Sequence, residues 1–285
     1  MSMLSVSGVQ NIYTTRFGGN KVEALRSVSF QVQRREYVAI MGESGSGKTT
    51  LLNILAALDK PTSGSVILDG QDLSKIKESQ AAAFRRDNLG FVFQEFNLLD
   101  TFSIEDNIFL PLVLAGMKYE QMQERLAPIA AQLGITALLK KYPYEISGGQ
   151  KRRAAIAGVL AMKPEILVLD EPAAGLDPRG REDILGGLMG YKNSAGATMI
   201  LVSHSMEDVA RYADRIAVIK QGSLFMQGSV GEIFMQPEKL FDSSLDLPQI
   251  TKLFVELKKR GIADDTDVYT VNYALEVLLK KLRKA

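Results

Sequence analysis

The sequence contains no cysteine, which excludes disulfide bonds and thiolate metal sites and suits a reducing compartment. Its charge is nearly balanced at +1, so no basic field points to nucleic acid as a partner. It also lacks the roughly 20 consecutive apolar residues of a membrane-spanning helix. The first residues carry no charged segment and no long apolar run, so we expect no signal peptide. Any membrane-spanning part of a complex would come from other subunits.

The 285 residues are 46% hydrophobic and 24% charged, which is typical of a globular protein with a sizeable core. This length predicts one large domain, or one domain with an appendage. Residues 3–32 alternate as β-structure does, with Val28, Phe30 and Val32 on one face. A turn is expected at residues 17–20. Tyr13 lies in this region, where it either stacks on a base or packs on a sheet face.

A glycine-rich stretch at residues 42–50 fits the phosphate-binding pattern G-x-x-x-x-G-K-[ST]. A buried strand is expected before it and a helix after it, which is the context that the pattern requires. Glycines let successive amides point inward, and a helix N-terminus favours negative charge. We predict that Lys48 reaches the β- and γ-phosphates of a triphosphate and that the Thr49 hydroxyl binds Mg²⁺. The alternative is a glycine-rich turn that precedes a helix by chance.

Two further apolar strands end in polar residues. Residues 165–170 read as a strand buried on both faces, and it ends in Asp170 and Glu171. Ligands of open α/β sheets lie at such strand ends, so we predict that Asp170 faces Mg²⁺ and Glu171 an attacking water. An ordinary acidic turn is the alternative. The strand at 198–202 is followed by His204, the single histidine, which is placed to sense a γ-phosphate or is merely structural.

Between these motifs, residues 95–145 show a helical pattern without a convincing strand, and we expect Pro111, Pro128 and Pro143 to punctuate it. Ser147 is a good helix N-cap before Gly148, Gly149 and Gln150. On its own, Ser-Gly-Gly-Gln is a weak signal, because such loops before helices are common.

In this order, the motifs resemble those of the ATP-binding subunit of an ABC transporter, over residues from about 3 to 230. The Walker A motif then supplies ATP-binding residues, which are Gly42, Ser44, Gly45, Ser46, Gly47, Lys48, Thr49 and Thr50. The resemblance makes Asp170 the end of Walker B, Glu171 the catalytic carboxylate and His204 the switch histidine. It makes Gln94 the Q-loop residue, which contributes to catalysis and to the Mg²⁺ site, and Tyr13 the aromatic residue that stacks on adenine.

The remaining motifs match the parts of the family that act across a dimer. Ser147, Gly148, Gly149 and Gln150 match the signature, with Ile146 where leucine is commoner, and Asp177 ends the D-loop at residues 174–177. The resemblance implies two subunits that sandwich two ATP molecules, each between one glycine loop and the partner's signature. The second subunit is the same or a different chain. The resemblance also implies transmembrane partner subunits and a cytoplasmic position, peripheral on the inner face of the membrane.

The implied fold is α/β, with a P-loop NTPase core and a mostly parallel sheet. An N-terminal antiparallel β-subdomain, a helical subdomain at about 95–160 and a small helical C-terminal extension complete it. We expect the ATP-binding domain at residues 1–230 and the extension at 231–285. Just before the extension, Ser229 begins a capping box that opens a short helix. The last helix is amphipathic and basic, and it is a cap on its own domain, a dimer contact or a lipid contact.

The two halves resemble different subfamilies. Residues up to about 145 resemble ATPases of macrolide efflux, lipoprotein release and peptide-antibiotic resistance, whereas later residues resemble those of energy-coupling-factor importers. This suggests a recombined or engineered chain. The alternative function is that of an ABC ATPase in DNA repair or translation. Such proteins usually carry coiled-coil inserts or two cassettes, which this sequence lacks, so we expect no nucleic-acid partner. Co-purification with a membrane subunit distinguishes the two functions.

Overall fold

The computed structural model describes residues 2–14, 19, 21–93, 95–264 and 266–282, which form two sheets. The antiparallel sheet, in spatial order, consists of β2 (Lys21–Gln33), β1 (Ser2–Thr14), β4 (Ser63–Leu68) and β5 (Gln71–Asp72). The larger sheet, in spatial order, consists of β10 (Ser223–Ser229), β9 (Arg215–Lys220), β3 (Tyr37–Met41), β8 (Thr198–Val202), β7 (Ile166–Asp170) and β6 (Leu89–Val92). The turn expected at residues 17–20 falls almost wholly outside the described residues.

The larger sheet is parallel from β9 to β6, and β10 runs antiparallel along its edge. A parallel sheet is covered on both faces, and β3 and β8 are buried at every residue. Because successive side chains in a strand point to opposite faces, β3 serves two cores. Val38 and Ile40 pack into the cluster that also contains residues of the antiparallel sheet, whereas Ala39 and Met41 pack into a cluster with the C-terminal half.

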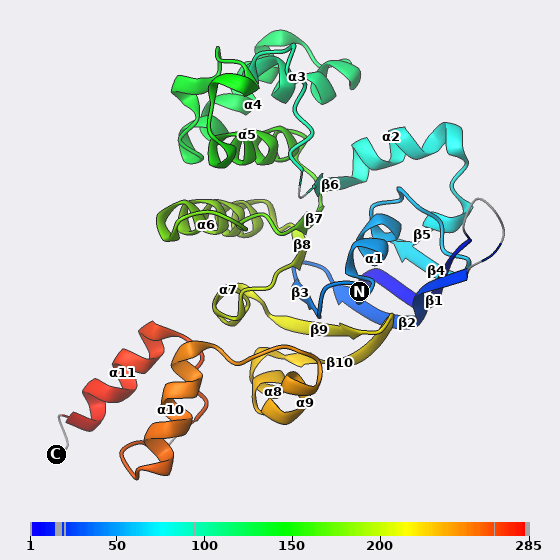
Figure 1. The fold of residues 1–285 in the computed structure, drawn as a ribbon. Helices are drawn as coiled ribbons and strands as arrows, with labels where there is room; N and C mark the ends of the chain where they lie inside the picture. The colour runs from blue at the N-terminus through cyan, green and yellow to red at the C-terminus, as the bar shows by residue number, and fades with distance from the viewer. Residues whose placement is uncertain (1, 15–18, 20, 94, 265, 283–285) are drawn as a thin grey trace.

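Helices cover both faces of the larger sheet (Figure 1). The helices are α1 (Lys48–Leu55), α2 (Glu78–Asn88), α3 (Ile104–Leu114), α4 (Tyr119–Gln132), α5 (Gly148–Ala161), α6 (Pro178–Ala195), α7 (Met206–Tyr212), α8 (Val230–Phe234), α9 (Pro237–Asp242), α10 (Gln249–Lys259) and α11 (Val271–Leu282). Short 3-10 turns occur at Leu73–Lys75, Thr136–Leu138 and Pro143–Glu145. In Figure 1, α3, α4 and α5 gather at one end of the molecule (green), and α10 and α11 lie at the other (orange to red). No described helix is long and apolar enough to cross a membrane.

Residues 95–145 contain helices and no strand, as expected, but the prediction about their prolines was partly wrong. Pro111 lies inside α3 and Pro128 inside α4. Proline removes one N–H donor from a helix and crowds the carbonyl four residues earlier. Both helices nevertheless bury apolar side chains, such as Ile108 and Leu126, in one cluster with α5. That burial offsets the local cost, because tertiary packing rather than propensity supplies most helix stability.

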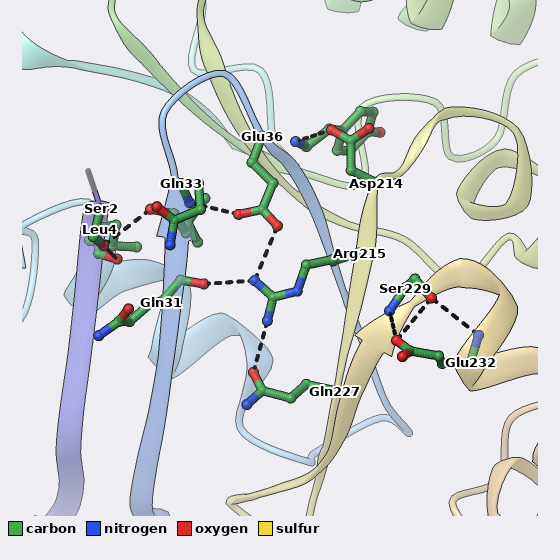
Figure 2. Close-up of polar contacts among 12 residues, drawn as sticks. Ser2, Leu4, Gln31, Gln33, Glu36, Asp214, Arg215, Gln227, Ser229 and Glu232 are labelled. Carbon is green, nitrogen blue, oxygen red and sulfur yellow. Dashed lines mark hydrogen bonds and ion pairs between the residues drawn. The ribbon is translucent and has the colours of Figure 1, made fainter.

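Arg215 joins the two sheets at the start of β9 (Figure 2). Its guanidinium donates to the carbonyl of Gln31 at 3.2 Å and to the side chain of Gln227 at 3.2 Å. It also pairs with Glu36 at 3.1 Å, and the Glu36 carboxylate accepts from the backbone N–H of Gln33 at 2.6 Å. One side chain therefore links β2, the turn before β3, and β10.

The C-terminal residues divide into two packing groups. Ile233, Phe234 and Leu240 of α8 and α9 are buried in the same cluster as Ala39 and Met41 of β3. Residues of α10, of α11 and of the segment between them instead form a small cluster of their own, which contains Phe254, Ala263, Val268 and Ala274. The capping box predicted at Ser229 is present at the start of α8 (Figure 2).

Candidate functional site

The carboxyl ends of β3, β8 and β7 meet at one edge of the sheet, because these strands are adjacent and parallel. Val202 at the end of β8 pairs with Ile40 on one side and with Asp170 on the other. A cavity of about 570 Å³ lies at this edge. Its lining includes Ser44, Gly45, Gly47, Lys48, Thr49, Thr50, Asp170, Glu171 and His204. Residues predicted separately from three strand ends therefore share one cavity.

Three glycines give the loop between β3 and α1 its shape. Gly42, Gly45 and Gly47 have φ angles of 151°, 77° and 103°, which other residues rarely adopt. Two of them are also in close contact with neighbouring backbone. A Cβ atom on Gly42 would lie 2.1 Å from the carbonyl of Ile219, and one on Gly47 would lie 2.5 Å from that of Ala24. Gly42 and Gly47 of the predicted motif are therefore restricted to glycine by both conformation and space, and Gly45 by conformation alone.

Lys48 begins α1 and is 7% exposed. Its ammonium group donates to the carbonyl oxygens of Gly42 and Glu43 at 2.8 and 2.7 Å, so the side chain curls over its own loop. Burial lowers the pKa of this ammonium, whereas the carboxylates of Glu171, Asp170 and Glu43 act in the opposite direction. The result is a cation held beside the loop amides, where a phosphate group would need it.

Ser46 connects the loop to a wall of the cavity that the motif did not reveal. Its side chain is buried, and its hydroxyl finds no hydrogen-bond partner among the described residues. Its carbonyl accepts from the N–H of Gly222 at 2.9 Å, and Gly222 in turn accepts from the N–H of Arg26 at 2.6 Å. Gln221, Gly222 and Arg26 all line the cavity. Nothing in the spacing of the sequence indicated that Gly222 contacts the loop.

Asp170 is the last residue of β7, and Glu171 follows it directly. Burial raises the pKa of the Asp170 carboxyl, the nearby Glu171 carboxylate raises it further, and Lys48 and His204 lower it. Glu171 has a φ angle of 48°, which is uncommon for a residue with a side chain. Its backbone is fixed by a hydrogen bond from its N–H to the carbonyl of Val202 at 3.1 Å. Such constrained conformations are frequent at functional sites.

The structure brings His204 to the same place. Its Nε2 atom lies 3.0 Å from Oε1 of Glu171. The imidazole side chain is 49% exposed and that of Glu171 is 20% exposed, so the pair lies at the mouth of the cavity. A carboxylate and an imidazole in contact can hold and move a proton, and this is the chemistry expected of a group that acts on water.

No group of three or more His, Asp or Glu side chains within the described residues could hold a metal ion by itself. Mg²⁺ does not need such a group when phosphates are present, because it usually takes one or two carboxylates plus substrate oxygens. Thr49 and Asp170, the predicted ligands, both line the cavity and supply oxygen atoms. The donor set therefore fits Mg²⁺ bound together with a nucleotide. Gln94, the third predicted ligand, lies outside the described residues.

Tyr13 is not among the residues that line the cavity. It lies near the end of β1, is 43% exposed, and its hydroxyl donates to Asp59 at 2.8 Å. Burial is the main cause that raises the pKa of its phenol, and the Thr50 hydroxyl acts in the opposite direction. Thr50 and Val22, the strand partner of Tyr13, do line the cavity. Tyr13 is therefore next to residues that line the cavity, but it does not line the cavity itself.

The predicted signature residues also lie outside this cavity. Ser147 is the N-cap of α5, and its hydroxyl and backbone exchange hydrogen bonds with Gln150 in a capping box. Gly148 is exposed, and a Cβ on Gly149 would lie 3.0 Å from Leu176. Asp177 caps α6 by accepting from the N–H of Gly180 at 2.7 Å. Within one chain, these residues do not meet the glycine loop.

The family model described as "ABC transporter" matches residues 25–174. The Energy-coupling factor transporter ATP-binding protein EcfA2 of Caldanaerobacter subterraneus subsp. tengcongensis is 41% identical over 261 residues, 91% of each chain. The bacitracin export ATP-binding protein BceA of Halalkalibacterium halodurans is 40% identical over 81% of this chain and 90% of its own. Both subfamilies indicated by the sequence are thus among the relatives.

Solved structures agree with these relatives. A dimeric, post-hydrolysis state of the ATP-binding cassette MJ0796, bound to ADP and Pi, superimposes with a TM-score of 0.75 at 32% identity. It covers 80% of this chain and 99% of its own. The cbiO1 protein of Clostridium perfringens, part of the transporter complex cbiONQ, matches with a TM-score of 0.73 at 29% identity, over 91% of this chain and 97% of its own.

Proposed function

This chain belongs to the ABC transporter family, and on that premise we propose how its own residues bind and hydrolyse ATP to drive a membrane transporter. A protein of this family is an ATPase subunit that works as a dimer. The observation that carries the proposal is the single cavity lined by Lys48, Thr49, Asp170, Glu171 and His204. Phosphoryl transfer needs a phosphate cradle, a metal ligand and a water-orienting group, and this cavity contains side chains suited to each task.

In the proposed mechanism, the amides of residues 42–50 and the ammonium of Lys48 hold the β- and γ-phosphates. Thr49 and Asp170 hold Mg²⁺, which when bound neutralises charge on the same phosphates. Glu171 orients the attacking water and takes its proton. His204 keeps the Glu171 carboxylate in place, and its ring lies beside the proposed position of the γ-phosphate.

The dimer supplies what one chain lacks. We propose that Ser147, Gly148, Gly149 and Gln150 contact the γ-phosphate bound by the partner's glycine loop, and that Asp177 also lies at this interface. The support is geometric: these residues are at the start of α5 and α6 and do not line the cavity of their own chain. Ser147 and Gly148 are exposed, so they are free to meet another subunit. Tyr13, at the rim, and Gln94 are proposed to complete the site.

Several finer assignments follow from the relatives. We propose that the partner in the membrane belongs to an energy-coupling-factor type of importer, because an EcfA2 protein matches 91% of this chain. The subunit would then lie on the inner face of the membrane, in the cytoplasm.

A groove of about 330 Å³ between the core and the helical insert is a suitable docking place for a transmembrane partner. Its apolar lining includes Leu58, Phe91, Phe93 and Leu114. The relatives give no support to a role in DNA repair or translation.

The decisive experiment is co-purification of the full chain with membrane proteins from its natural host, together with a phosphate-release assay. We expect a transmembrane subunit to co-purify and Mg-ATP to be hydrolysed, with hydrolysis lost when EDTA removes Mg²⁺. Stable binding to nucleic acid or ribosomes, with no membrane partner, would contradict the transport function. Hydrolysis that persists in EDTA would contradict the Mg²⁺ assignment.

A further inference from the structure

Glu171 and His204 line a second cavity as well, of about 360 Å³. None of residues 42–50 lines it, so it is distinct from the nucleotide cavity. Its walls come from the D-loop and from the first turns of α6 and α7. Arg181 reaches into this space from α6 and joins the D-loop helix to the segment that carries His204.

The contacts of Arg181 converge on the residue next to His204. Its Nη1 donates to Oγ of Ser205 at 3.2 Å, and the same nitrogen lies 3.6 Å from Oδ2 of Asp208. Ser205 caps α7 by accepting from the N–H of Asp208 at 3.2 Å. The backbone N–H of Ser205 donates to the hydroxyl of Ser203 at 3.1 Å. Local bonds thus shape the segment, and Arg181 ties it to another helix.

At its other end, Arg181 is fixed to the D-loop. Its backbone N–H donates to the carbonyl of Asp177 at 2.9 Å, which is the first hydrogen bond of α6. The side chain of Asp177 caps the same turn through Gly180. A hydrogen-bonded helical turn moves as a unit, so a displacement of the D-loop carries Arg181 with it.

We propose that Arg181 is a positioning residue that couples the D-loop to His204 and thereby sets the contact between His204 and Glu171. It is not a catalytic residue, because it does not line the nucleotide cavity. The inference rests on the proposed function, in which Glu171 and His204 act on water and the D-loop faces a second subunit. A partner subunit that moves the D-loop would then change the contact between His204 and Glu171 by displacing the guanidinium of Arg181.

A matched control exists on the same two helices. Arg211 of α7 pairs with Glu182 of α6, with a distance of 2.7 Å between Nη2 and Oε1. Its side chain is 47% exposed, and it forms neither a hydrogen bond nor an ion pair with residues 203–205, all of which the structure describes. Arg211→Ala therefore removes an ion pair between α6 and α7 without touching the residues beside His204. It separates a general loosening of the helices from the specific effect of Arg181.

The test uses the full chain, with active sites counted by binding of a fluorescent ATP analogue in EDTA. Arg181→Ala is expected to lower kcat for ATP by about tenfold, as misplacement of a reacting group does, with KM and analogue affinity changed by less than about twofold. Arg211→Ala should keep the parental kcat per active site. Equal loss in both variants, or parental kcat in Arg181→Ala, overturns the proposal.

The route through His204 is tested by combining substitutions. In a His204→Ala background, Arg181→Ala should cause no further loss of kcat, because its target is gone; a further tenfold loss overturns the proposal. Ser205→Gly keeps a tolerable N-cap but removes the hydroxyl, and it should reproduce the effect of Arg181→Ala. If the alanine variant is not recovered folded, Arg181→Lys is measured by the same criteria. Absence of hydrolysis by the parent would instead contradict the proposed function itself.

Discussion

The Nε2 atom of His204 lies 3.0 Å from Oε1 of Glu171, across the ends of the adjacent strands β8 and β7. A carboxylate has no proton to donate, so the imidazole supplies the hydrogen of this contact. One oxygen of Glu171 is thereby engaged, and the other has no hydrogen-bond partner among the described residues, so it can accept from a water molecule. The geometry favours different tasks for the two residues: Glu171 acts on the water molecule, and His204 orients the carboxylate of Glu171.

The first prediction concerns nucleotide binding. Lys48→Ala should abolish tight ATP binding, because it removes the cation that the loop holds beside the predicted phosphate position. The loss should be at least about a hundredfold in Kd, since a hydrogen bond to a charged group contributes about 1.5–3 kcal/mol and the cation makes several such contacts. Fluorescence titration measures it. Lys258→Ala, at an exposed position on α10, is the control. Unchanged affinity in Lys48→Ala would mean that the loop is not the site.

Much of this site could be predicted from sequence because its parts are local. The glycine loop, the two acids at the end of β7 and the cap at Ser147 each occupy a short stretch whose spacing has a direct physical meaning. Parallel strands then bring the stretches together at one edge of the sheet. The alternation of β2 followed in the same way, because Val28, Phe30 and Val32 share one face as predicted, and the structure shows that this face is buried.

The rest depends on contacts between distant residues, which leave no local pattern. The hydrogen bond from Gly222 to Ser46 spans most of the chain, and so does the contact of the Ser244 hydroxyl with the Glu43 carboxylate at 3.2 Å. The internal positions of Pro111 and Pro128 were missed because burial overrides a local helix-breaking preference. The residues proposed to face a second subunit could be recognised only through the family resemblance.

The second prediction concerns the junction of the two sheets. Arg215→Ala should lower the free energy of unfolding by about 1–3 kcal/mol, because it leaves the Glu36 carboxylate without its cation. The Glu36 side chain is only 10% exposed, so water replaces the lost partner poorly. Chemical denaturation of the full chain measures the change. The control is Lys220→Ala, at the other end of β9, which breaks the 2.6 Å ion pair between Lys220 and Asp242 of α9. This substitution should lower the free energy of unfolding by less, since Asp242 is 63% exposed. Equal midpoints for both variants would contradict the role of Arg215.

The third prediction concerns the C-terminal helices. Val271, Leu275 and Leu279 recur every four residues on α11 and are 70%, 57% and 43% exposed, which suits contact with a second subunit. Removing residues after 247 should leave nucleotide binding intact and weaken self-association without nucleotide by at least about tenfold, the loss expected when one apolar contact of about 1.4 kcal/mol disappears. Sedimentation measures it.

The point of truncation matters, because Phe234, Leu240, Leu245 and Leu247 pack against β3 and β9. A cut near residue 235 would expose that core and should yield poorly soluble protein. In the full chain, Leu275→Glu should reproduce the loss of self-association, and Glu276→Ala on the same exposed helix should not. Equal dimer fractions in the parent and the shortened chain would mean that α10 and α11 only cap their own domain.

The fourth prediction concerns the chemical step and uses Glu171→Gln. The substitution keeps the size and hydrogen-bonding reach of the side chain but removes the base, so turnover should fall by on the order of 10²-fold or more. It also removes a negative charge close to the predicted γ-phosphate, so ATP should bind at least as tightly as in the parent. A steady-state phosphate-release assay and a nucleotide titration measure the two effects. His204→Ala should also slow turnover, by a smaller factor, because Glu171 keeps its carboxylate and loses only the partner that orients it.

Blocked hydrolysis has a second consequence that separates the base from the dimer. If Glu171 acts on water while the signature of a partner covers the γ-phosphate, the Gln variant should accumulate ATP at the interface and hold two subunits together. Size-exclusion chromatography with Mg-ATP should then show a dimer that ADP does not support. Adding Lys48→Ala to the Gln variant is the matched control, since it removes the nucleotide and should abolish the dimer. Parental turnover in Glu171→Gln would refute the role of the carboxylate. Slow turnover without an ATP-dependent dimer would leave that role intact and remove the support for Ser147 as a residue that acts on the partner's nucleotide.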